Sequence, residues 1–144
     1  MATSADLLTA LKTQWTAGVA AGTISSSIVG PYRDREPAKE TPVYPYCVVT
    51  IAPDPRLDHQ TNQSEFWLIN VEIAIYDNTD AKSEGYIDGI GAYFDHRLPS
   101  LAAGKGSVLR VRRLGESYGR EGRGVHKAVL KYEYLRQKPR VAAA

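Results

Sequence analysis

The chain has 144 residues, the length of one ordinary domain, and its 18 Lys and Arg against 16 Asp and Glu give a formal net charge of +2. This near balance argues against a polycationic protein of the histone type. Hydrophobic residues make up 43% of the chain, enough for a core that needs no disulfide or metal to hold it together. The single cysteine, Cys47, excludes an internal disulfide.

Targeting and membrane signals are weak in this sequence. The first residues lack the basic region and apolar run of a signal peptide. No apolar stretch approaches the ~20 residues that a bilayer-spanning helix needs. We therefore expect a non-secreted protein with no membrane partner.

The small net charge hides two oppositely charged halves. Residues 1–96 carry six Lys and Arg against 13 acidic residues, a formal charge of −7, and residues 97–144 carry 12 against three, a charge of +9. Such polarity indicates either a surface that faces nucleic acid or a subunit whose two ends meet complementary neighbours. Two halves that neutralise each other within one fold are an equally simple explanation.

The first third of the chain predicts a helix and a short strand. A capping-box-like start at Thr3 opens onto an apolar stripe with i, i+4 spacing, which predicts a helix over 4–20 that ends near Gly22. Val29 to Tyr32 has the character of a short edge strand, and residues 33–42 form a charged, proline-containing loop.

Two principal strands follow. Residues 44–52 are rich in aromatic and β-branched side chains, with Cys47, Val49 and Ile51 on one face. Residues 53–64 are polar and read as a connection. Over 65–76 the odd-numbered positions from Trp67 onward are apolar, whereas Asn70 and Glu72 on the other face are polar, so one face points at a core.

A second helix is expected from the cap candidates at 77–80 to Leu98, where Pro99 stops it. Its apolar stripe contains Ile87, Ile90, Phe94 and Leu98. Three glycines in this segment disfavour a helix, and close backbone packing or a kink would explain them: Gly85, Gly89 and Gly91.

The basic half predicts two more strands, over 108–114 and 125–136. Between them, residues 115–124 contain four glycines and no apolar periodicity, which indicates a long, mobile hairpin loop. The fold class is therefore α+β: a mostly antiparallel sheet of four or slightly more strands with two helices packed on one face. We expect one domain over 1–138 and a tail over 139–144.

Catalytic and cofactor signals are missing from the pattern. None of the three histidines has a second ligand at metal-like spacing, and Cys47 sits in an apolar strand as an inert thiol would. The glycine-rich segments match no phosphate-binding loop. We expect no enzyme activity, no catalytic residue, no metal and no cofactor.

Five arginines gather in about 14 residues of the basic half and are the strongest candidates for a partner or DNA-facing surface: Arg110, Arg112, Arg113, Arg120 and Arg123. Arg110 and Arg112 alternate on one strand face, and Arg120 and Arg123 extend from the adjoining loop. The strand has no aromatic residue to stack bases, which argues against sequence-specific reading. Backbone contact with DNA, an acidic partner, or a merely solvated face remain as alternatives.

Several segments together resemble the tail terminator, or tail completion, proteins of long-tailed bacteriophages. The resemblance covers residues 4–137 and lies in the opening helix, in Tyr44-Pro45-Tyr46 before the strand 47–52, in the strand that ends at Asp77, and in the helix followed by Leu98-Pro99. It implies a ring-forming α/β subunit, usually a hexamer, that caps the tail tube and joins it to the neck of the head.

Membership would imply a structural protein of the virion tail or neck, assembled in the host cytoplasm. Its partners would be further copies of itself, the tail tube protein, neck or connector proteins, and genomic DNA through non-specific contact. Segments that would contact neighbouring subunits include the residues Arg33, Asp34, Arg35, Glu36 and Tyr118. The alternatives are a neck or head-tail connector ring protein, and a small sequence-independent DNA-binding domain that uses the basic half.

Overall fold

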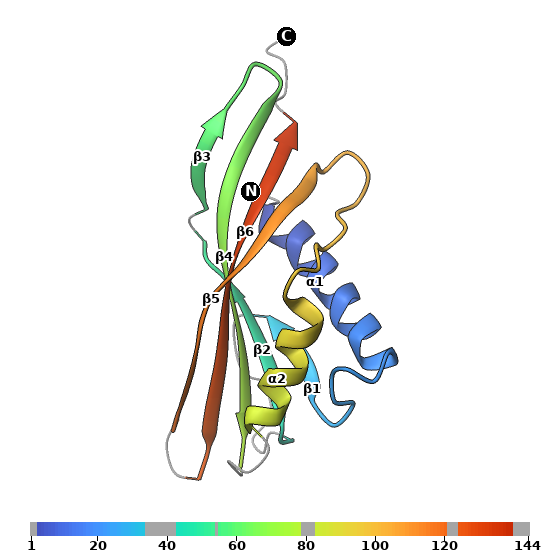
Figure 1. Cartoon of the computed structure of the whole chain (residues 1–144), viewed down its shortest axis with the longest axis vertical. Coiled ribbons are helices and arrows are strands. Elements are labelled where there is room, and N and C mark those ends of the chain that lie inside the picture. The colour runs from blue at the N-terminus through green and yellow to red at the C-terminus, as the bar shows by residue number, and fades with distance from the viewer. Residues whose placement is uncertain (1–2, 34–42, 54, 79–82, 121–123, 140–144) are drawn as a thin grey trace.

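A computed structural model describes residues 3–33, 43–53, 55–78, 83–120 and 124–139. Its elements in chain order are α1 (Thr3–Ala20), β1 (Val29–Arg33), β2 (Tyr46–Ile51), β3 (Arg56–Gln60), β4 (Ser64–Asp77), α2 (Ser83–Phe94), β5 (Ser107–Arg120) and β6 (His126–Pro139). The two helices lie on the same side of one strongly twisted sheet, as Figure 1 shows. The predicted α+β class is confirmed.

The sheet has six strands in the order β1-β2-β4-β6-β5, with β3 paired to β4 beyond the end of β2. All pairs are antiparallel except β1 with β2. The longest ladder of the sheet joins β4 and β6 and runs from the Ser64–Pro139 pair to the Asp77–His126 pair. β1, as predicted, and β5 are the edges of the main path, and β3, which pairs only with β4, forms a further edge.

The helix side of the sheet holds the core. The residues that alternate inward on the central strands are all buried: Cys47, Val49 and Ile51 on β2; Ile69, Val71, Ile73 and Ile75 on β4; Ala128, Leu130, Tyr132 and Tyr134 on β6. They pack against Leu7, Leu11 and Trp15 of α1 and Ile87, Ile90 and Phe94 of α2. The sequence pattern predicted this face because period 2 in strands and 3.6 in helices bring one set of side chains together.

Two glycines of α2 allow close packing. A Cβ atom at Gly89 would lie 2.5 Å from the Thr23 carbonyl oxygen, and one at Gly91 would collide with the Arg113 guanidinium. Close backbone packing therefore holds at Gly89, whereas Gly91 leaves room for the Arg113 side chain. The close-packing interpretation is wrong at Gly85, where nothing lies within 4 Å.

Three predicted boundaries are wrong. β5 continues through residues 115–120 and pairs with β6, so the expected 115–124 hairpin loop is mostly strand; residues 121–123 lie outside the described part. The polar stretch 53–64 contains β3, whose residues are all exposed and therefore carry no alternation. α2 ends at Phe94 rather than Leu98, and Leu98 is exposed.

Two bulges set the facing of β5. The register shifts between Val108 and Arg110 and again between Arg113 and Gly115, so Leu109 and Leu114 are extra residues in the ladder. Between the bulges the odd-numbered residues Val111 and Arg113 face the helix side, whereas beyond the second bulge the even-numbered residues do so. Glu116 and Tyr118 therefore share the helix side of the sheet with Leu130 and Ala128, their partners on β6.

Candidate assembly surfaces

The sheet face opposite the helices, here called the open face, is uneven. At its β2 end Tyr46 stacks on its cross-strand partner Tyr76, with ring centroids 5.0 Å apart, and Tyr32 and Tyr44 contact Tyr46 edge-on or tilted. Tyr46 itself is buried. The aromatic lead into β2 thus forms a packed cluster rather than an exposed patch.

Further along the same face the side chains are short or polar and leave a hollow of about 250 Å³. One row across the sheet runs through Thr50, Glu72, Lys131 and Gly115, and the absence of a side chain at Gly115 leaves space at its end. The residues that line the hollow are Thr50, Ala52, Asn70, Val71, Glu72, Leu114, Lys131 and Tyr132.

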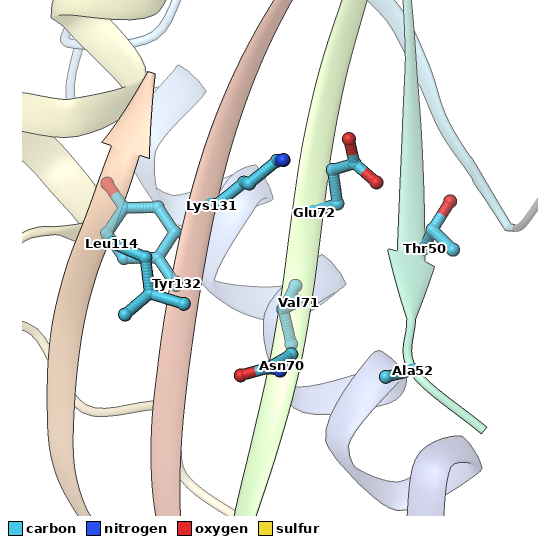
Figure 2. A pocket seen from close by; sticks show the side chains of 8 residues that line it. All are labelled: Thr50, Ala52, Asn70, Val71, Glu72, Leu114, Lys131 and Tyr132. Carbon is cyan, nitrogen blue, oxygen red and sulfur yellow. The ribbon is translucent and has the colours of Figure 1, made fainter. Parts of the chain in front are cut away.

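Figure 2 shows how these side chains lie. The Lys131 side chain leans across the sheet toward Glu72, while Thr50 stands on the far side of Glu72, on β2. Leu114, the extra residue of the second bulge, borders the hollow from β5 and is 45% exposed. The hollow is therefore lined mainly by apolar surface, and its charged groups are the Lys131 ammonium and the Glu72 carboxylate.

The open face carries more cations than carboxylates among the described strand residues. By register its charged side chains are Arg56, Arg110, Arg112, Lys127 and Lys131 against Glu72 and Glu133. Glu133, whose side chain is only 9% exposed, lies 3.0 Å from the guanidinium of Arg112, which is 61% exposed. A nearly buried carboxylate needs such a partner, since leaving it unpaired is costly.

On the helix side, Asp95 joins α2 to the β5–β6 pair. The Tyr132 hydroxyl donates to Asp95 Oδ1 over 2.8 Å, Arg113 Nε donates to the same oxygen over 3.0 Å, and Arg113 Nη2 lies 2.8 Å from Asp95 Oδ2. Burial, and then the hydrogen bond to Asp95, raise the pKa of the Tyr132 phenol well above its usual range. Asp95 is thus a structural anchor between the end of α2 and the β5–β6 pair.

A second exposed feature, here called the tyrosine patch, consists of Tyr118 with Glu116, Glu84 and Asp88. Tyr118 is 50% exposed, and its hydroxyl donates to Glu116 Oε2 over 3.2 Å. Desolvation and then the negative charges of Glu116, Asp88 and Glu84 raise the pKa of Tyr118 to about 12. Arg120, two residues further along β5, lies on the same side of the sheet as Tyr118.

The arginines singled out by the sequence are divided between the two faces. Arg110 and Arg112 share one strand face, as predicted, and this is the open face, whereas Arg113 and Arg120 lie on the helix side. Arg120 belongs to a strand rather than to the adjoining loop, and Arg123 lies outside the described part. Arg112 and Arg113 are each paired with a carboxylate of this chain.

The residues expected at inter-subunit contacts are placed only in part. Arg33 is the last residue of β1, and Asp34, Arg35 and Glu36 lie outside the described residues. Tyr118 is half exposed on β5. The hollow was not predicted as a site, although the polar residues Asn70 and Glu72 on the second principal strand marked the face on which it lies.

Groups that could support catalysis or a metal are few in the described ranges. Cys47 is fully buried, and burial raises the pKa of its thiol far above the ordinary value, which keeps it protonated. Across the described residues, no cluster of three or more His, Cys, Asp and Glu side chains has the arrangement of a metal site. Neither described helix combines the length and the apolar character needed to cross a bilayer.

Comparison with solved structures finds a likeness over nearly the whole chain. A chain from the "Virion of native gene transfer agent (GTA) particle" superposes on this chain with a TM-score of 0.71 and 14% sequence identity, covering 95% of this chain and 98% of that one. The two chains therefore share a fold over nearly their whole lengths. No protein-family model matches the sequence, and no curated protein matches it either.

Proposed function

We propose that this chain is a structural subunit of a phage-like virion and, more narrowly, a tail terminator that forms a ring, a hexamer, at the end of the tail tube. The observation that carries the proposal is the whole-chain likeness to a chain of an assembled gene transfer agent virion. The likeness covers 95% of this chain, and the resemblance to tail terminators in the sequence covers residues 4–137.

The geometry supports a role in assembly. The hollow on the open face and the tyrosine patch on the helix side both present partly exposed apolar groups beside charges. Such surfaces are typical of contacts between subunits. In the proposed role the chain binds further copies of itself, the tube protein and neck proteins. It is part of the virion tail, which is assembled in the host cytoplasm.

The test is the molar mass of the purified chain, measured by size-exclusion chromatography with light scattering, alone and after addition of purified tail tubes. A ring, or association of the chain with tube ends, is the expected result. A chain that stays monomeric in both conditions and does not bind tubes would contradict the proposal. Binding to isolated head connectors but not to tube ends would instead identify a neck protein.

A sequence-independent DNA-binding domain is the second candidate, favoured by the shared facing of Arg110, Arg112 and Lys131. It requires an affinity for duplex DNA that falls steeply with salt and that weakens on all sequences alike in the double variant Arg110→Ala with Arg112→Ala. The pairing of Arg112 with Glu133 weighs against it, because the guanidinium already neutralises a carboxylate.

A further inference from the structure

Two surfaces of this chain are complementary to one another but lie on opposite faces of the same sheet. The hollow belongs to the open face, where Lys131 pairs in register with Gly115. Three residues further along β5, Tyr118 projects on the helix side, in register with Ala128. One molecule therefore cannot bring its own two surfaces into contact.

Their shapes and polarity match. Tyr118 is a half-exposed aromatic ring, and the hollow of about 250 Å³ is bordered by the exposed Leu114. A cavity of roughly 150 Å³ already holds benzene. The hollow is therefore large enough to receive a tyrosine ring, and entry of the ring would remove two exposed apolar side chains from water.

Their charges match as well. The Tyr118 hydroxyl donates to Glu116, and the negative charges of Asp88 and Glu84 also act on it, whereas the cation Arg120 follows two residues along on the same face of β5. Lys131 and Glu72 are the charged residues that line the hollow, and Arg110 adds a cation on the same face of β5, where Arg112 is already paired with Glu133. Two tyrosine patches facing each other would bring like charges together, whereas a patch facing a hollow brings opposite charges together.

We propose that neighbouring copies of this chain assemble head to tail, with the tyrosine patch of one copy seated in the open-face hollow of the next. Because the two surfaces differ, the contact is heterologous and leaves one free patch and one free hollow on every growing oligomer. Closure into a ring consumes both. This inference rests on the proposed function and specifies which surfaces would build its ring.

Two variants test the contact, each with a matched control. Tyr118→Ala removes the ring, and Leu57→Ala, a similarly exposed apolar residue on β3, is its control. Lys131→Glu reverses the charge over the hollow, and Lys12→Glu on the exposed side of α1 is its control. Both test residues are exposed, so circular dichroism and the melting temperature of each variant should match the wild type within a few degrees.

The expected result is that Tyr118→Ala and Lys131→Glu each weaken self-association about thirtyfold or more, as loss of a central contact does, while both controls assemble as the wild type. Mixing the two variants is the decisive step. Each retains one intact surface, so the mixture should form a dimer of about twice the 15.8 kDa chain mass and nothing larger.

The outcomes separate the two proposals. If both variants form the same rings as the wild type, the proposed contact is wrong and the proposed function still stands. A mixture that regains full rings, or that forms no dimer while each variant is folded, would also overturn it. A wild-type chain that never assembles, with or without tail tubes, would overturn both.

Discussion

The two faces of the sheet differ in what their side chains do. On the helix side, almost every inward residue of β2, β4 and β6 is buried in one apolar cluster with α1 and α2. On the open face, the same strands present Thr50, Asn70, Glu72 and Lys131 around a hollow. A single strand such as β4 thus alternates between residues that hold the fold together and residues that remain available for a partner.

The contrast is sharpest between adjacent residues of β4. Ile73→Ala should destabilise the fold by about 3–4 kcal/mol, because it leaves a cavity at a fully buried site. Glu72→Ala, one residue away on the open face, should cost less than about 1 kcal/mol. Urea unfolding of the two variants measures the difference, and equal losses would show that the faces do not differ in this way.

Asp95 provides the next largest expected effect. Asp95→Ala removes the acceptor of the Tyr132 hydroxyl and the partner of Arg113, so the free energy of unfolding should fall by about 2–3 kcal/mol. Asp88→Ala, on the exposed side of α2, which ends one residue before Asp95, is the matched control and should change stability by less than about 0.5 kcal/mol. If Tyr132→Phe in the Asp95→Ala background recovers nothing, the hydroxyl is not the group that needs Asp95.

A polar residue within the core offers a test in the opposite direction. Gln14 is buried on α1, and neither atom of its amide has a hydrogen-bond partner among the described residues. Gln14→Leu should therefore raise the unfolding free energy by about 1 kcal/mol, since it removes an unpaired amide and adds apolar burial. Thr13→Leu, at the neighbouring exposed position, should leave stability within about 0.5 kcal/mol of the wild type.

The smallest effect concerns alkaline pH. Burial, and then the charges of Tyr132 and Asp95, raise the pKa of the Tyr134 phenol above its usual value, so its neutral form stabilises the native state. This contribution is complete below pH ~10, the ordinary phenol pKa, and is lost as the pH rises above it. Tyr134→Phe removes a buried hydroxyl that has no hydrogen-bond partner among the described residues, so it should be at least as stable as the wild type at pH 7 and lose less stability by pH 11. Parallel losses in both proteins would contradict this.

The helix side was largely predictable from the sequence because its determinants are local. The alternation from Ile69 to Ile75 and the helical spacing of Leu7, Leu11 and Trp15 can be recognised in the sequence without knowing which elements they pack against. β3 was not predictable, since its exposed residues lack alternation and it is held only by pairing with β4.

The candidate surfaces depended on features that local patterns do not carry. The bulge at Leu114 decides that Tyr118 lies on the helix side and that Leu114 borders the hollow. Arg113 points to Asp95, 18 positions earlier in the chain, rather than to a surface shared with Arg112. Tyr118 was expected at a subunit contact for its place in a glycine-rich segment, and that expectation stays a prediction.

The most direct test of the account is the molar mass of Lys131→Glu in solution, measured by light scattering on the sample used for its urea unfolding curve. Because the helix side stabilises the fold and the open face binds the neighbouring copy, this variant should have the urea midpoint of the wild type and yet fail to form the wild-type oligomer. A variant that still assembles like the wild type, or that loses assembly only because it has lost stability, would contradict the account.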